Sequence, residues 1–283
     1  MKKMIVGIFV GLALTWLPCQ AEEKLFVTDV LSKKEIEARM SFLYIHDSTD
    51  FHRGSPSFLT GNQKNDFFAS EYYLGLGLGH ELEVAAWIPY VFFDKLKNRF
   101  DSYPDPQTFH YRKDGVGDFH VGAKYRVFDE EDKPFTLVAG LETKFDTASE
   151  NDGGTGSTDV SPFVAASVTV ANGVRPYVVY SFTERNHGKK DTHSIRLGME
   201  KELDERVGLN GFLQGSFHTS SDLVTSYETY QFRVESYIRV YGNLYVLPGV
   251  GMAINSCADR KDLDLHFDST RGMVVMLSFY RLF

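Results

Sequence analysis

The side chains best suited to covalent chemistry in this 283-residue chain are one serine and two histidines. Ser216 and His218 are two residues apart, and on an extended strand this spacing puts both side chains on one face. His120 is a second candidate base. A nucleophile and a base within hydrogen-bond reach would suit a hydrolase acting on lipids. However, no sequence motif joins these residues, and the usual acylhydrolase signatures are missing.

A larger set of ionisable residues occupies alternate positions of otherwise apolar stretches. These residues carry both signs of charge, so they can pair across neighbouring strands or line a wet cavity that selects a solute. The set consists of Arg39, Glu71, His120, Lys124, Arg126, Glu142, Lys144, Arg196, Glu200, Arg233, Glu235 and Arg239. Whether these charges leave an open path or pair with one another and plug it is not decided by the sequence.

The stretches that position these charges alternate with a period of two residues. Apolar residues take every second place from Phe119 to Val127, and polar or small residues fill the places between them. The same pattern recurs from Phe135 to Phe145 and from Tyr230 to Val240. This period predicts β-strands with one apolar and one polar face.

Twelve such stretches can be counted between Glu35 and the C-terminus, joined by links that alternate in length. The short links lie near residues 79–81, 130–134, 171–173, 204–205 and 242–243. The long polar links cover residues 47–65, 94–115, 146–158, 184–192, 219–226 and 255–271. An even strand number with short turns at one end and long loops at the other is typical of outer-membrane barrels.

The N-terminus has the form of a secretory signal peptide. Lys2 and Lys3 precede an apolar run, and small Ala21 precedes two glutamates. The run is shorter than the roughly 20 residues of a membrane-spanning helix. We therefore expect a signal peptide over residues 1–21, a periplasmic segment over residues 22–34 and a barrel over residues 35–283.

These features together predict an all-β fold, a closed antiparallel transmembrane barrel in the outer membrane of a Gram-negative bacterium. A soluble sandwich also alternates, but its strands are shorter, about 5–6 residues, than the 10–12 expected here. Closure follows because lipid offers no hydrogen bonds to an open sheet edge. The last residue, Phe283, ends an alternating strand as the assembly signal of outer-membrane proteins does, although Arg281 departs from that pattern.

Composition limits the partners. Removing residues 1–21 takes away two lysines and no acid, so the net charge falls from −8 to −10, which disfavours nucleic acid. Cys257 is then the last cysteine, and one cysteine forms neither an internal disulfide nor a thiolate metal cluster. We expect no metal and no cofactor. The expected partners are outer-membrane lipid, the barrel-assembly machinery and a small-molecule solute.

Several short motifs resemble the outer-membrane channel family named for the MetA pathway of phenol degradation. They are Gly115-Val116-Gly117-Asp118, Gly122-Ala123-Lys124-Tyr125, Gly156-Ser157-Thr158-Asp159-Val160-Ser161-Pro162, Arg175-Pro176-Tyr177 and Pro248-Gly249-Val250-Gly251. Each motif alone is weak, but together they span most of the chain in the expected order. The resemblance implies a barrel that passes small, aromatic or hydrophobic molecules, and it implies no catalytic residues.

The leading hypothesis is therefore passive passage of a small solute, without enzymatic activity. The alternatives are the lipid hydrolase that would use Ser216, and a plugged structural or adhesive barrel supported by the long loops. Two points stay open at this stage. They are whether residues 22–34 enter the lumen, and whether the loop over residues 151–158 folds inward.

Overall fold

A computed structural model describes residues 27–53, 59–101, 107–130, 133–149, 153–186, 190–221, 224–261 and 265–283. The expected signal peptide and residues 22–26 lie outside these ranges, so that prediction stands untested. In the described part, no helix is long and apolar enough to cross a membrane. A short 3-10 turn, η1 (Ala171–Gly173), is the helical element seen there.

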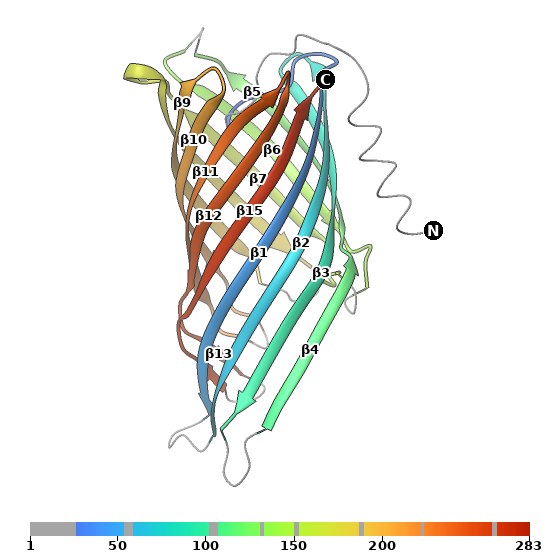
Figure 1. Cartoon of the computed structure of the whole chain (residues 1–283), viewed down its shortest axis with the longest axis vertical. Coiled ribbons are helices and arrows are strands. Elements are labelled where there is room, and N and C mark those ends of the chain that lie inside the picture. Colours follow the sequence, from blue (N-terminus) through green and yellow to red (C-terminus); the bar gives the residue numbers. More distant parts are fainter. Residues whose placement is uncertain are drawn as a thin grey trace.

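The chain is almost entirely β-strand (Figure 1). The first strands are β1 (Ile36–Arg53), β2 (Leu59–Gly79), β3 (Leu82–Phe100), β4 (Gln107–Val116), β5 (Phe119–Phe128), β6 (Thr136–Phe145) and β7 (Asp159–Ser167). They are followed by β8 (Val174–Arg185), β9 (Thr192–Asp204), β10 (Val207–His218), β11 (Tyr227–Tyr241), β12 (Leu244–Asn255), β13 (Ala258–Arg260), β14 (Leu265–Phe267) and β15 (Thr270–Leu282).

These strands form the predicted closed antiparallel barrel of twelve strands. Closure is visible at β1, which pairs with β2 on one side and with the last strand, β15, on the other. Strands β4 and β5 share one position in the wall, because both pair with β3 at different heights. Strands β13 and β14 form a small hairpin within the connection from β12 to β15, and β14 pairs with the end of β1.

The C-terminus helps to close the seam between the first and last strands. The backbone of Phe283 exchanges two hydrogen bonds with Ile36, with N···O distances of 2.9 and 3.1 Å. Arg281 turns back over the ring of Phe283, with its guanidinium carbon 4.7 Å from the ring centroid. The departure from the usual apolar residue at Arg281 is thus accommodated at the rim. An assembly role for Phe283 remains a prediction.

The apolar face of the sheet points outward. Leu213 in β10 and Phe232 in β11 are 61% and 49% exposed, and large apolar residues on most other strands are similarly exposed. A soluble sandwich would bury this stripe, whereas a barrel in lipid presents it to the acyl chains. The polar positions between them, such as Arg233 and Glu235, face the interior and are largely covered.

The predicted short links that the structure describes in full, near residues 79–81, 171–173, 204–205 and 242–243, are tight turns at the end of the barrel that holds residue 36 and the C-terminus. His80 and Glu81 both have positive φ, 53° and 62°, between β2 and β3. Two successive residues of positive φ make the hairpin turn whose twist matches the flanking strands. Because outer-membrane barrels keep their short turns in the periplasm, this end is the periplasmic one.

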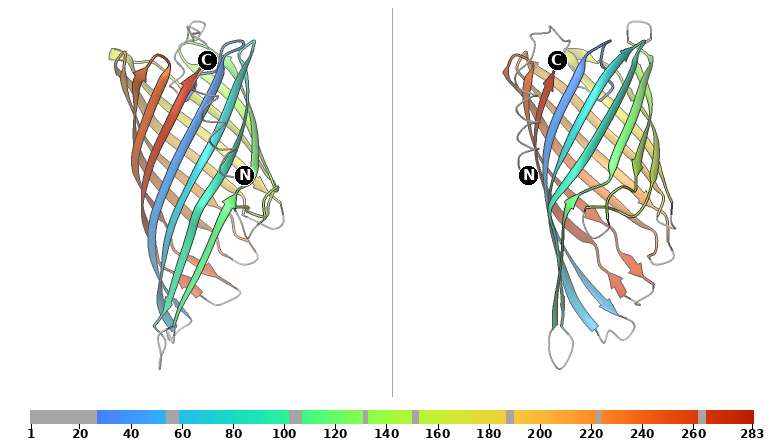
Figure 2. Two further views of the ribbon diagram at one scale, coloured as in Figure 1. Left: turned by 45° about the vertical axis from the view of Figure 1, so that its right-hand side comes forward. Right: turned by 90° about the vertical axis from the view of Figure 1, so that its right-hand side faces the viewer.

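Two of the predicted long links are wrong in extent. Much of residues 47–65 and 94–115 continues as strand, since β1 runs to Arg53, β2 starts at Leu59, and β3 and β4 pair through Lys97 and His110. Figure 2 shows these strands projecting beyond the rest of the barrel, away from the C-terminus. Beyond the membrane both faces of a sheet are wet, so the apolar alternation vanishes although the backbone pairing continues.

Candidate functional site

The middle of the barrel interior carries paired charges next to aromatic rings. Arg39 Nη2 lies 3.5 Å from Glu71 Oε1, and its guanidinium stacks 4.5 Å above the ring of Tyr73. Three wall positions from β1, on β11, Arg233 Nη1 lies 3.1 Å from Glu235 Oε1. These four predicted residues therefore face the interior as two ion pairs, on β1–β2 and on β11.

Two more predicted residues occupy the same level. Arg196 donates from Nε to Gln214 Oε1 at 2.9 Å, and its guanidinium lies 4.6 Å from the ring centroid of buried Phe212. Glu142 in β6 is within electrostatic reach of both Arg196 and Arg39. The charges therefore interact around the wall with neighbours several strands away, which the sequence pattern did not reveal.

Three other predicted residues, His120, Arg126 and Arg239, contact the wall or the turns at the barrel end. His120 stacks on Trp87 with 5.0 Å between ring centroids. Arg126 Nε is 3.2 Å from Glu81 in the periplasmic turn. Arg239 donates from Nε to the carbonyl oxygen of Gly242 at 2.6 Å. The two arginines thus bind turns at the periplasmic rim, so their contacts here are structural.

The N-terminal residues 27–34, which we call the plug segment, enter the barrel at the periplasmic end. The backbone N–H of Val27 donates to Glu200 Oε1, and that of Leu31 donates to Glu83 Oε2, each at 3.0 Å. Both glutamates are only 1% exposed. Because a buried carboxylate without partners is costly, these two acceptors bind the plug segment strongly.

Apolar contacts reinforce this docking. Leu31 is 1% exposed and belongs to a buried cluster with Tyr245, Tyr280 and Leu282 from the last two wall strands. Val30 packs into a second cluster on the opposite wall, with Val138 and Ala165. The Thr28 hydroxyl is 2.7 Å from the Ser167 hydroxyl. The plug segment therefore bridges walls that are far apart in the sequence.

An ion-pair network surrounds the plug segment. Lys124 Nζ lies 3.4 Å from Glu83 Oε2 and also donates to the backbone oxygen of Asp29. The Asp29 carboxylate accepts from Arg175 Nη1 at 3.3 Å. Lys124 and Glu200, both predicted as interior residues, thus hold a segment of their own chain. The question of residues 22–34 is answered for residues 27–34, which do enter the lumen.

The predicted interior residue Lys144 belongs to a third cluster, at the extracellular end. Its Nζ lies 2.9 Å from Asp159 Oδ2 and 3.2 Å from the buried Ser157 hydroxyl. Asp159 also accepts from Arg185 Nε at 3.1 Å. This cluster joins β6, β7 and β8 where these strands leave the wall.

Buried Asp118, between β4 and β5, fixes the connection that follows β6. Its carboxylate accepts from the backbone N–H of Thr147, Ala148 and Thr155 at 3.1, 3.0 and 2.8 Å. The Thr155 hydroxyl adds a fourth hydrogen bond at 2.8 Å. The described residues of this connection, 146–149 and 153–158, are therefore tied back to the wall. Residues 150–152 lie outside the described part.

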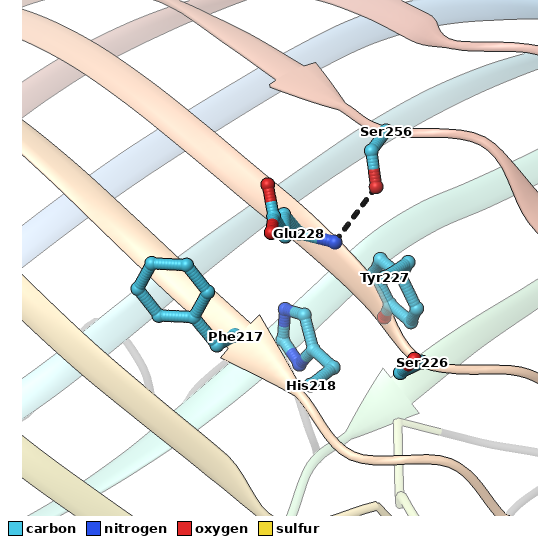
Figure 3. Close-up of a pocket in the computed structure, with 6 residues that line it drawn as sticks. All are labelled: Phe217, His218, Ser226, Tyr227, Glu228 and Ser256. Carbon is cyan, nitrogen blue, oxygen red and sulfur yellow. Dashed lines mark hydrogen bonds between the residues drawn. The ribbon is translucent and has the colours of Figure 1, made fainter.

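The hydrolase hypothesis finds no support in the geometry. Figure 3 shows His218 in an open hollow at the extracellular ends of β10 and β11, next to Tyr227 and Glu228. Its Nδ1 and Nε2 lie 3.0 and 3.2 Å from the hydroxyls of Thr192 and Thr229. The Ser216 hydroxyl instead contacts Ser194 at 2.8 Å. No nucleophile–base hydrogen bond joins Ser216 and His218 in the described residues.

Sequence reasoning missed Asp29, Glu83, Asp118 and Arg175 as site residues. All but Asp29 stand opposite or beside an apolar stripe, so the alternation alone identifies them as inward-facing. Asp29 carries no such signal, because the plug segment is not a strand. Among the described residues, no group of three or more His, Cys, Asp or Glu side chains is placed to hold a metal ion.

No protein-family model matches this chain, and no curated protein matches it in sequence. Among solved structures it is similar to an outer membrane channel from Pseudomonas putida F1. That likeness has a TM-score of 0.66 at 14% identity, covering 93% of this chain and 100% of the other. It establishes the fold, that of a Gram-negative outer-membrane β-barrel.

Weaker likenesses extend to barrels of other activities. The Escherichia coli outer membrane protease OmpT is 11% identical with a TM-score of 0.43, covering 90% of this chain and 100% of the other. A Pseudomonas aeruginosa FadL homologue is 8% identical with a TM-score of 0.44, covering 89% and 90%. These two scores support no conclusion about this chain. The chain is a closed outer-membrane barrel that holds the plug segment inside its periplasmic end.

Proposed function

We propose that this barrel is a passive outer-membrane channel for a small solute, and that the plug segment gates its periplasmic end. The observation that carries the proposal is the way in which the plug segment is held. It adds no strand to the sheet and is held mostly by side-chain contacts, chief among them Glu83, Glu200 and buried Leu31. Its last residue, Lys34, makes one backbone hydrogen bond to Gly77 of β2 at 2.8 Å. Such a segment can leave without breaking the barrel wall.

The interior chemistry suits a solute that carries an aromatic ring. Trp87, His120 and Tyr73 form a continuous inward-facing aromatic surface, with centroid distances of 5.0 and 5.8 Å between neighbouring rings. Across the barrel, Arg196 and Arg233 both lie over the ring of Phe212. Flat faces and cations beside them favour aromatic molecules through stacking and cation–π contact. The motifs that resemble the MetA-pathway channel family support the same solute class.

Planar-bilayer conductance tests the gated channel directly. We expect small or intermittent currents from the full mature chain, and larger, steadier currents from a variant that lacks residues 27–34. If neither protein carries ion current after it has been shown to fold, the channel proposal is wrong.

The solute class can be tested on the same bilayers. Phenol should block the current of the deletion variant more strongly than cyclohexanol, which has a similar size but no aromatic ring. Trp87→Leu should weaken that block. The matched control is Phe145→Leu, which removes a ring from the exposed outer face. Equal block by both compounds would exclude recognition of aromatic solutes.

The plugged structural barrel is the second candidate, and the same buried plug segment favours it. In that case the plug segment would stay in place permanently as part of the fold. The two proposals differ in one outcome, because only a gate allows a thiol placed in the plug segment to react while the barrel remains intact.

A further inference from the structure

The projecting part of β1–β4 has an outer face that continues the lipid-facing side of the barrel. Strand register defines its rows, because directly paired residues share a face. The first row consists of His46, Asp66, Lys95 and Arg112. The second row consists of Ser48, Lys64, Lys97 and His110. The third row consists of Asp50, Asn62, Arg99 and Thr108. We call these three rows the outer wall.

Two lysines face each other in the second row. Lys64 on β2 is the direct cross-strand partner of Lys97 on β3, and both are exposed. Like charges directly opposite each other destabilise a sheet. Within the part of the chain that the structure describes, neither lysine has an acidic side chain at ion-pair distance. An anion bound between them would turn this repulsion into attraction.

A third lysine extends the cationic surface toward the membrane. Lys95 is exposed, two residues before Lys97 on β3, and its Nζ lies 4.5 Å from the ring centroid of Phe93. A long side chain anchored on an aromatic ring places its ammonium group at the boundary between lipid and water. Lys64, Lys95 and Lys97 therefore form a triangle of cations on one outward surface.

The two arginines of the outer wall are paired with acidic residues that follow them in the chain. Arg99 Nε lies 2.9 Å from Asp101 Oδ1, and Arg112 Nε lies 4.0 Å from Asp114 Oδ1. Of the two acidic residues in the outer wall itself, Asp50 stands on β1 at the far edge from β3.

Asp66 also belongs to this face, next to the triangle. It is engaged by two neighbours, at 2.7 Å from His46 Nδ1 and 3.0 Å from the Tyr44 hydroxyl, although it still attracts Lys95. Lys64 and Lys97 are thus available to bind an external anion.

The height of the outer wall above the membrane identifies that anion. On β1 the outward residues are apolar or aromatic from Ile36 to Tyr44, about nine residues, which is the length of one tilted membrane crossing. His46 then begins the outer wall on the side away from the periplasm. The lysines therefore lie at and just above the headgroups of the outer leaflet, and they face the lipid rather than the lumen.

We propose that the outer wall binds the phosphate groups of lipopolysaccharide, the phosphorylated glycolipid of the outer leaflet. Its phosphates lie in the plane that the triangle occupies, and its acyl chains would pack against the apolar stripe directly below. The whole chain has a net charge of −8, so a local cluster of exposed lysines at this depth is not explained by general basicity. The inference does not depend on the channel proposal.

The test uses the full mature chain, folded in detergent, and purified lipopolysaccharide with phosphorylated lipid A. The variant replaces Lys64, Lys95 and Lys97 by glutamine. Each lysine near an anionic surface contributes about a fivefold effect, so we expect binding to weaken on the order of tenfold or more. Added salt should weaken binding of the native chain and have little effect on the variant.

Two controls separate charge from folding. Lys133→Gln, Lys201→Gln and Arg206→Gln together remove three cations from the periplasmic end and should leave binding unchanged. Arginine at all three positions of the triangle should retain binding, because the charge is kept. Heat-modifiable electrophoretic mobility reports whether each variant is folded.

Three results would overturn the proposal. They are equal binding by the glutamine variant, an equal loss in the periplasmic control, and equal binding of dephosphorylated lipid A by the native chain. Competition by millimolar inorganic phosphate as effective as that by the lipid would identify a free-anion site instead. A loss of binding that is confined to the phosphorylated lipid and to the glutamine variant would support the lipopolysaccharide proposal.

Discussion

Replacing Leu31 by alanine is the sharpest perturbation of the plug segment. Leu31 is 1% exposed among Tyr245, Tyr280 and Leu282, so truncation leaves a cavity that these rings cannot fully close. Such a change in a buried leucine costs about 2–5 kcal/mol. Because the wall strands pair with one another around the closed barrel, we expect this cost to appear as undocking rather than as unfolding.

The free-energy cost of the Leu31→Ala substitution predicts how far the undocked fraction of the plug segment should rise. At about 1.4 kcal/mol per factor of ten, the lower bound of 2 kcal/mol raises the undocked fraction about 30-fold. A cysteine at Thr28, which is buried in the docked state, reports that fraction through its reaction with a membrane-impermeant maleimide. Cys257 is exposed and is first replaced by serine.

The control for this experiment is Leu213→Ala, which removes the same atoms from a side chain that is 61% exposed to lipid. The maleimide reaction rate should rise about 30-fold or more with Leu31→Ala and stay unchanged with Leu213→Ala. The reasoning is refuted if both variants react at the same rate, or if Leu31→Ala loses the heat-modifiable barrel altogether.

Three further outcomes are expected. Burial alone would raise the pKa of Asp118, but hydrogen bonds from Thr155, Ala148 and Thr147 outweigh it and hold this pKa below its ordinary value. The stabilisation is therefore complete above the unfolded pKa of about 3.9 and is lost only as the pH falls through the lower folded pKa. Hydrogen exchange of residues 146–149 should stay slow at pH 4, and Asp118→Asn should accelerate it. Gly208→Ala should destabilise the barrel by about 1–3 kcal/mol in thermal unfolding, because its Cβ would meet the Tyr237 ring at 1.7 Å. Gly211→Ala, whose Cβ would meet no atom closer than 4.0 Å, should have little effect. Burial and the nearby Lys261 lower the pKa of Lys190 to about 8, so acetic anhydride at pH 8 should modify Lys190 faster than Lys64, as measured by peptide mass spectrometry.

The sequence by itself determined the wall of the barrel. Alternation is a local property of a strand, and in lipid one face of the strand must be apolar along its whole length. The sequence alone therefore predicts that Phe232 faces the lipid and Arg233 the interior. The number of strands and the separation of short turns from long loops at opposite ends followed from the same alternation and from the lengths of the links. The alternation did not predict the projecting parts of β1–β4, because strand pairing beyond the membrane needs no apolar face.

Only the tertiary structure decided what the interior charges contact. Glu200 looks like any other inward-facing charge in the sequence, yet it accepts a hydrogen bond from Val27, 173 residues away. Closing the barrel sets such distances, and no local periodicity encodes them. The plug segment lacks alternation because it is not a strand, and its place inside the lumen results from two buried carboxylates and a pocket for Leu31. The wall is thus determined by short-range sequence pattern, whereas the docking of the plug segment depends on contacts that exist only once the barrel has closed.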